Sequence, residues 1–77
     1  MAMSFVLIKT KPAKELHVYS RLTNEPEIKE VYPLFGEFDF LVKIIAKDFK
    51  VIGKVVIEKI RIIDGVIETI TLNEMPI

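Results

Sequence analysis

Two short runs of this sequence are apolar on both of their faces, and this property constrains the fold more than any other. The runs Ser4–Thr10 and Asp39–Ala46 are rich in β-branched and aromatic residues, which is typical of β-strands. Successive side chains of a strand point to opposite faces, so both faces of a sheet that contains these strands carry large apolar groups. Such a sheet needs a covering layer on each side.

A stretch with helical periodicity follows the first of these runs. It extends from Pro12, which suits an initial helical turn, to about Asn24, with Thr10 as the expected N-cap. Leu16 belongs to the stripe that we expect this helix to bury. Pro26 prevents the helix from continuing further.

A second periodic stretch begins at Asp48, a good N-cap, and extends to about Ile63. The stripe that this helix is expected to bury consists of Phe49, Ile52, Val56, Ile60 and Ile63. Gly65 fits the left-handed position that commonly ends a helix.

Two further runs complete the set of predicted strands. The run Glu27–Phe35 contains Pro33, which cannot donate a hydrogen bond to a neighbouring strand, so we expect it at an edge of the sheet or at a bulge. The run Val66–Leu72 is predicted to be the last strand. Its expected faces are Ile67, Thr69 and Thr71 on one side and Val66, Glu68, Ile70 and Leu72 on the other.

This order of elements, βαββαβ, defines a ferredoxin-like α+β sandwich. The preferred handedness of crossover connections gives a four-stranded antiparallel sheet with strand order 4-1-3-2 and both helices on one face. We expect a single domain over residues 1–77. Its uncovered face would carry a row of large apolar side chains, such as Phe5, Leu7, Leu41 and Ile45. Because burying this surface is strongly favourable, we predict that the chain dimerises through its sheet.

The composition excludes several functional classes. Eleven basic and eleven acidic residues cancel, whereas nucleic-acid-binding proteins usually carry a basic excess. The chain has no cysteine and a single histidine, His17, so a disulfide, a thiolate metal site and a multi-histidine metal site are excluded. No catalytic constellation is visible, and no cofactor is predicted. No apolar run is long enough for a membrane span and no signal peptide is present, so we expect a cytoplasmic protein.

The turn between the second and third strands, residues 34–39, has two interpretations that the residues alone leave open. In the structural one, Gly36 adopts a backbone conformation that other residues resist and Asp39 accepts hydrogen bonds from turn amides. In the functional one, Gly36 lets a ligand approach the backbone and Asp39 supplies a negative charge for an ammonium group. Thr69 and Thr71 are similarly either good strand formers or hydroxyl contacts for a polar ligand.

At this point the sequence resembles a known family. The stretch Val31–Asp39 leads into the third strand through a Gly-x-x-Asp turn, and Ile63–Leu72 contains a glycine, a valine and then alternating threonines. Both patterns resemble the C-terminal effector domain, or RAM domain, of the Lrp/AsnC family of transcriptional regulators, and the resemblance covers essentially the whole chain. Full regulators of that family carry an N-terminal helix-turn-helix domain. Here the chain begins with Met1-Ala2-Met3 and enters its first predicted strand at once, so we expect a stand-alone effector domain without its own DNA-binding domain.

The same resemblance implies a non-enzymatic function in transcription regulation. Dimers formed sheet to sheet would assemble further into octamers or decamers, with full-length Lrp/AsnC regulators as further partners. The implied ligand is a free amino acid bound between dimers. The implied ligand-binding residues are Gly36, Glu37, Phe38, Asp39, Thr69 and Thr71.

Each of these residues has an implied role. The Gly36 backbone and its neighbouring amides would face the ligand, and Asp39 would hold the α-ammonium group. Glu37 and Phe38 would shape the selectivity for the ligand side chain, and the two threonines would add polar contacts.

Two alternatives remain beside this one. The chain could be a small dimeric α+β-barrel enzyme of the monooxygenase-like kind, which would require His17 or Tyr32 to face a cavity. It could also be a purely structural oligomerisation domain with an empty turn.

Overall fold

Strands and helices follow one another along the chain in the predicted βαββαβ order. The computed structural model describes all residues, 1–77. Its elements are β1 (Ala2–Thr10), α1 (Glu15–Thr23), β2 (Ile28–Pro33), β3 (Phe40–Ala46), α2 (Phe49–Val55), η1 (Val56–Ile60) and β4 (Val66–Asn73). The segment η1 is a π-helical continuation of α2.

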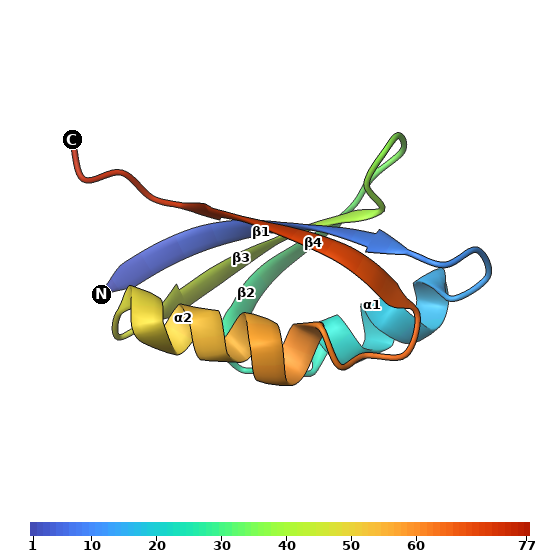
Figure 1. Ribbon diagram of the computed structural model, residues 1–77, viewed down its shortest axis with the longest axis horizontal. Coiled ribbons are helices and arrows are strands. Elements are labelled where there is room, and N and C mark those ends of the chain that lie inside the picture. The colour runs from blue at the N-terminus through green and yellow to red at the C-terminus, as the bar shows by residue number, and fades with distance from the viewer.

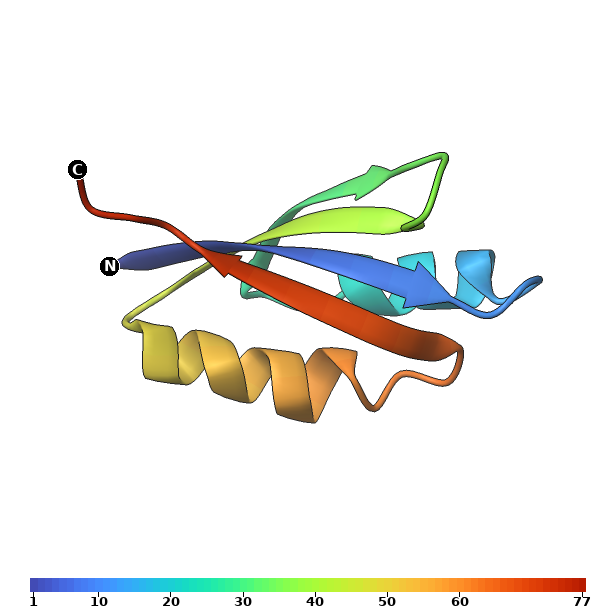
Figure 2. The same cartoon turned by 45° about the horizontal axis from the view of Figure 1, so that its top comes forward.

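The four strands form one antiparallel sheet in the order β2-β3-β1-β4. Figure 1 shows the helices α1 and α2 on the same side of this sheet, where they form one layer. Figure 2 shows that no helix or strand covers the opposite side. The predicted ferredoxin-like α+β fold and strand order are therefore confirmed. Pro33 is the last residue of β2, and β2 is an edge strand, as the missing N–H of proline requires.

The core lies between the helices and the sheet because β1 and β3 alternate strictly between buried and half-buried residues. Val6 pairs with Val42 and Ser4 with Ile44, and all four side chains are completely buried. The helical layer adds the buried residues Val18, Leu22, Ile52, Val55, Val56, Ile60 and Ile63.

The start of α1 differs from the sequence prediction. The helix begins at Glu15 rather than near Pro12, and its N-cap residue, Lys14, makes no side-chain capping bond. Thr10 is not the N-cap, because it is the last residue of β1. The predicted buried stripe was also wrong for Leu16, which is 85% exposed, since the helix turns Val18 and Leu22 toward the sheet instead.

The second helix starts as predicted. The side chain of Asp48 caps it by accepting a hydrogen bond from the Val51 N–H at 2.9 Å. Phe49 departs from the predicted buried stripe and is exposed. After η1 the chain reverses at Gly65, whose φ of +104° lies in the left-handed region that the sequence predicted.

A bulge near the start of β4 changes the predicted faces of that strand. Lys9 pairs with Glu68 whereas Thr10 pairs with Val66, so Ile67 is the extra residue. Val66 therefore packs against the core, and its predicted position on the face of Ile70 was wrong.

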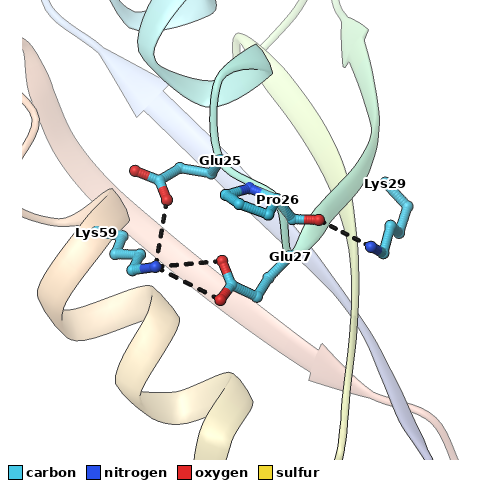
Figure 3. A network of polar contacts seen from close by, with 5 residues as sticks. All are labelled: Glu25, Pro26, Glu27, Lys29 and Lys59. Atoms are coloured by element: carbon cyan, nitrogen blue, oxygen red, sulfur yellow. Dashed lines mark hydrogen bonds and ion pairs between the residues drawn. The ribbon is translucent and has the colours of Figure 1, made fainter.

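A cluster of charges attaches η1 to the connection between α1 and β2. The Lys59 ammonium lies 3.3 Å from a Glu27 carboxylate oxygen and 3.5 Å from Glu25, and the Lys29 ammonium donates to the Pro26 carbonyl (Figure 3). Hydrogen bonding to Glu27 is the main cause that raises the pKa of Lys59. The pKa of Glu27 is lowered, first by a backbone hydrogen bond and then by Lys59. The Lys59 contacts thus link η1 to the connection between α1 and β2.

The helix-free face of the sheet, here called the open face, carries the predicted apolar row. Phe5, Leu7, Leu41 and Ile45 lie on the face opposite the buried core and are only half-buried. Ile70 and Leu72 of β4 continue the row and are exposed. Toward β2 the row ends in an ion pair between the Lys43 ammonium and Glu30, at 3.4 Å.

Candidate functional site

The β2–β3 hairpin tip, residues 34–39, projects from the sheet on the side away from the helices (Figures 1 and 2). Gly36 has a φ of +125°, a conformation that side chains with a Cβ resist. A Cβ placed there would meet no atom within 4 Å. Backbone conformation therefore favours glycine at this position, and the space that a Cβ would occupy is open.

Asp39 attaches the hairpin to the end of β1. Its Oδ2 accepts hydrogen bonds from the Thr10 N–H at 2.8 Å and from the Thr10 hydroxyl at 3.1 Å. Its own N–H donates to the Ile8 carbonyl, and its carbonyl accepts from the Leu34 N–H. The side chain of Asp39 thus accepts from the end of β1 and not from amides of the turn, as the structural interpretation expected, and Oδ1 has no hydrogen-bond partner in the chain.

The backbone around Gly36 has unused hydrogen-bond donors. The N–H groups of residues 35–38 donate to no acceptor within the chain. Consecutive free N–H groups in a tight turn form a suitable cradle for a carboxylate. The turn therefore has backbone donors that are free to bind an anion, and its last residue, Asp39, has a carboxylate oxygen that is free to accept from a cation.

Thr69 and Thr71 lie on a different part of the sheet. Ile8 of β1 pairs with Phe40 on one side and with Thr69 on the other, so Thr69 lies two strand spacings, roughly 10 Å, from the base of the hairpin. Thr71 pairs with Val6, farther from the hairpin. Within one protomer β1 thus separates both threonines from the turn.

Thr69 borders a hollow of about 440 Å³ at the free edge of β4. The hollow is lined by Arg61, Val66, Ile67, Glu68 and Thr69. Sequence reasoning missed Arg61 because the helical stretch was expected to continue through it, whereas the π-helical segment ends one residue earlier. It also missed the contact between Thr10 and Asp39, which follows from the register of β1 with β3.

A second hollow, of about 240 Å³, lies between α1 and the start of β3. It is lined by Glu15, Leu16, Tyr19, Pro33 and Phe40. Neither hollow includes His17 or Tyr32, so the enzymatic alternative gains no support from this geometry. The Tyr32 hydroxyl instead donates a hydrogen bond to Glu30, which raises the pKa of Tyr32.

No cluster of three or more potential metal ligands is formed by histidine, cysteine, aspartate or glutamate side chains. None of the helices has both the length and the apolar character needed to cross a membrane.

The fold defines the class of protein, a ferredoxin-like α+β domain, and comparison with known proteins identifies the family. The model of the Lrp/AsnC ligand binding domain matches residues 3–73. An HTH-type transcriptional regulator of Pyrococcus furiosus is 39% identical over 72 residues, which cover 90% of this chain and 48% of that protein. The chain therefore belongs to the Lrp/AsnC ligand-binding domain family, and it spans about half the length of the regulators it matches.

Solved structures agree with this assignment. The crystal structure of FFRP-DM1 is 33% identical, with a TM-score of 0.92, and the match covers 97% of this chain and all of that one. AsnC of Escherichia coli is 25% identical, with a TM-score of 0.90, over 97% of this chain and 51% of that one. A Neisseria meningitidis regulator in complex with L-Met shares the fold, with 17% identity and a TM-score of 0.86, over 97% of this chain and 50% of that one.

Proposed function

We propose that this domain binds a free amino acid at the turn formed by residues 36–39 and acts without catalysis as a regulatory module. One observation carries the proposal: the turn has free N–H groups at residues 35–38, and it also has a carboxylate oxygen, Asp39 Oδ1, that accepts no hydrogen bond. An α-amino acid presents the complementary pair, a carboxylate next to an ammonium group. The relationship to a family of ligand-binding regulators supports the same choice of ligand.

Each group of the turn has a proposed contact. The free N–H groups of Gly36, Glu37 and Phe38 receive the α-carboxylate, and Asp39 Oδ1 accepts from the α-ammonium group, as a charge-assisted hydrogen bond. The Glu37 and Phe38 side chains, which flank this point, select among ligand side chains. Because Thr10 already holds Oδ2, the Asp39 carboxylate is fixed in orientation before a ligand arrives.

Thr69 and Thr71 join this site only if another copy brings its β4 edge to the turn. The apolar open face supports a homodimer that packs sheet against sheet, and such dimers would assemble into an octamer or decamer. A ligand bound at a boundary between copies shifts the population of assembly states when it binds one state more tightly than the other. If the domain assembles with full-length Lrp/AsnC regulators in the cytoplasm, this shift in assembly would change how those regulators control transcription.

Calorimetric titration with the common amino acids tests the ligand proposal. Asp39→Asn keeps one oxygen acceptor for Thr10 but removes the charge and replaces the second oxygen with an NH2 group, so we expect the affinity of the best ligand to fall about 10- to 100-fold. Thr10→Val is the matched control, because it removes the hydroxyl bond to Asp39 and leaves the ligand contact, so its affinity should remain within a few-fold of wild type.

Equal affinities for wild type and Asp39→Asn would show that Asp39 is only a structural turn residue. Binding of no amino acid by a folded, assembled wild-type protein would favour the structural oligomerisation domain instead.

A further inference from the structure

The two threonines of β4 lie on the side of the sheet that carries the helices. Thr69 pairs with Ile8 and Thr71 pairs with Val6, and directly paired residues of antiparallel strands point to the same face. Ile8 and Val6 are completely buried beneath the helices, whereas Thr69 is half-buried and Thr71 is exposed. The helical layer therefore leaves this side of β4 uncovered, and the hollow of about 440 Å³ lies there.

Two irregularities of the backbone border this hollow, here called the β4 hollow. The extra residue of the β4 bulge, Ile67, is part of its lining. The π-helical segment η1 ends immediately before Arg61, whose N–H donates to the Val56 carbonyl at 2.8 Å. Because a π turn holds about one residue more than an α turn, Arg61 is rotated by roughly 100° from its place in a continuous α-helix. Bulges and π turns are both frequent beside functional sites.

The Arg61 guanidinium lines the β4 hollow and has no ion-pair partner in the chain. The Asp64 carboxylate, three residues further on, is bound by Lys14 at 3.0 Å. Glu68 pairs with Lys9, which points to the open face, so the Glu68 side chain points to that face as well. The β4 hollow thus contains a cation that no carboxylate of its lining neutralises.

We propose that the β4 hollow binds a small monocarboxylate, with the carboxylate held by the Arg61 guanidinium and the Thr69 hydroxyl. A guanidinium donates two parallel N–H bonds to a carboxylate, and the hydroxyl supplies a third donor. Val66 and Ile67 line the same hollow and suit a short apolar body. Its volume of about 440 Å³ lies within the usual size of small-molecule sites, roughly 300–1,000 Å³.

The lining also determines which carboxylate is preferred. An ammonium group next to the ligand carboxylate would meet the Arg61 cation and find no carboxylate side chain to accept from it. A keto acid, which has a carbonyl in place of the ammonium group of an amino acid, avoids this cost. The turn at residues 36–39 has the opposite preference, because Asp39 can accept from an ammonium group. The two sites are separate, so this proposal goes beyond the amino-acid site and does not depend on it.

NMR titration of the backbone amides tests the proposal with two matched pairs of compounds. The keto acids are pyruvate and α-ketoisocaproate, and the amino acids with the same carbon skeletons are L-alanine and L-leucine. We expect the keto acids to shift the amides of residues 66–69, and each amino acid to bind there at least about 10-fold more weakly than its keto acid.

Two variants assign the contact. Arg61→Gln removes an exposed cation, so the fold should persist while keto-acid affinity falls about 10-fold or more. Lys54→Gln is the matched control, because Lys54 is an exposed cation of the same helical layer that does not line the β4 hollow, and its affinity should equal that of wild type.

The outcomes separate this site from the turn. No shift at residues 66–69 with either keto acid, equal affinity there for an amino acid and its keto acid, or equal losses in Arg61→Gln and Lys54→Gln would each overturn the monocarboxylate site. Shifts confined to residues 35–39 would overturn it as well and would leave the amino-acid site standing. Keto-acid shifts at residues 66–69 that Arg61→Gln abolishes would support it even if no amino acid binds the turn.

Discussion

The two faces of the sheet are built from adjacent residues of the same strands, yet they have opposite environments. On the face toward the helices, Val42 and Ile44 are completely buried. On the open face, Leu41 and Ile45 keep part of their surface in water although their side chains are equally apolar. The difference shows that the chain encodes two apolar layers and that its own helices satisfy only one of them.

Neighbouring isoleucines of β3 give the sharpest test of this difference. Ile44→Ala should lower the free energy of unfolding by about 2–5 kcal/mol, because it opens a cavity in a closed core. Ile45→Ala should cost about 1 kcal/mol at low protein concentration, where the open face is uncovered. Chemical denaturation at several protein concentrations measures both values, and Ile44→Val, at about 0.5–1.5 kcal/mol, is the control for a smaller cavity. Equal costs for Ile44→Ala and Ile45→Ala would contradict the comparison.

The two glycines with positive φ lie in connections on opposite sides of the sheet, Gly36 in the hairpin tip and Gly65 in the connection that leads to β4. Substitutions at these glycines compare the packing on the two sides. Gly65 lies against the helical layer, and a Cβ there would come within 2.7 Å of the Lys14 Cβ. Gly65→Ala should therefore cost about 1–3 kcal/mol from strain and collision together. Gly36→Ala should cost about 1 kcal/mol, since backbone conformation is its only penalty.

Thermal and chemical unfolding of the two glycine variants provide the measurement. A Gly36→Ala variant that is less stable than Gly65→Ala would show that the hairpin tip is more tightly packed than the connection beneath the sheet.

We expect the smallest effects on stability from the ion pairs near the two faces of the sheet. The pKa of Glu27, beside the helical layer, is lowered by a backbone hydrogen bond and by Lys59, so this stabilisation is present above pH 4.5 and is lost as the pH falls through the folded-state pKa. Glu30, at the open face, has a pKa lowered first by the Tyr32 hydroxyl and then by Lys43, with the same sign. Protonation of either carboxylate therefore removes its stabilising contribution, and both losses occur in the same acidic pH range.

Their variants separate fold from assembly. Glu27→Gln should remove a small, concentration-independent part of the acid sensitivity of unfolding. Glu30→Gln should remove a small part of the acid sensitivity of association, because its carboxylate lies at the open face. We would measure the free energy of unfolding and the mass of each variant as the pH is lowered, and we expect the two variants to differ in both profiles. Identical profiles for the two variants would refute the assignment of Glu30 to the interface.

Most of the fold was predictable because it follows from local rules. Apolar runs, the proline in β2, the Asp48 cap and the glycine after η1 each act within a few residues. The exposure of Leu16 was not predictable, because periodicity shows that a helix has an apolar stripe but not which side packs on the sheet. The bulge at Ile67 likewise depends on the pairing with β1, which no short stretch of sequence specifies.

The candidate site divides in the same way. The turn residues Gly36–Asp39 were recognisable from their short pattern. The hydrogen bonds from Thr10 to Asp39 were not, because they join residues 29 positions apart and depend on the register of β1 with β3. The two threonines cannot be joined to the turn within one protomer, because β1 lies between them. Their role as ligand contacts, and the stand-alone nature of the domain, stay predictions.

Sedimentation equilibrium of the wild-type chain and an Ile45→Glu variant tests the central claim, that the open face is covered by a second copy. At micromolar concentration the wild type should have the mass of at least a dimer. Ile45→Glu would bury a charge in that interface, so it should lose this association while it keeps its circular dichroism spectrum. A wild-type protein that remains monomeric, or an Ile45→Glu variant that associates as strongly as wild type, would contradict the account.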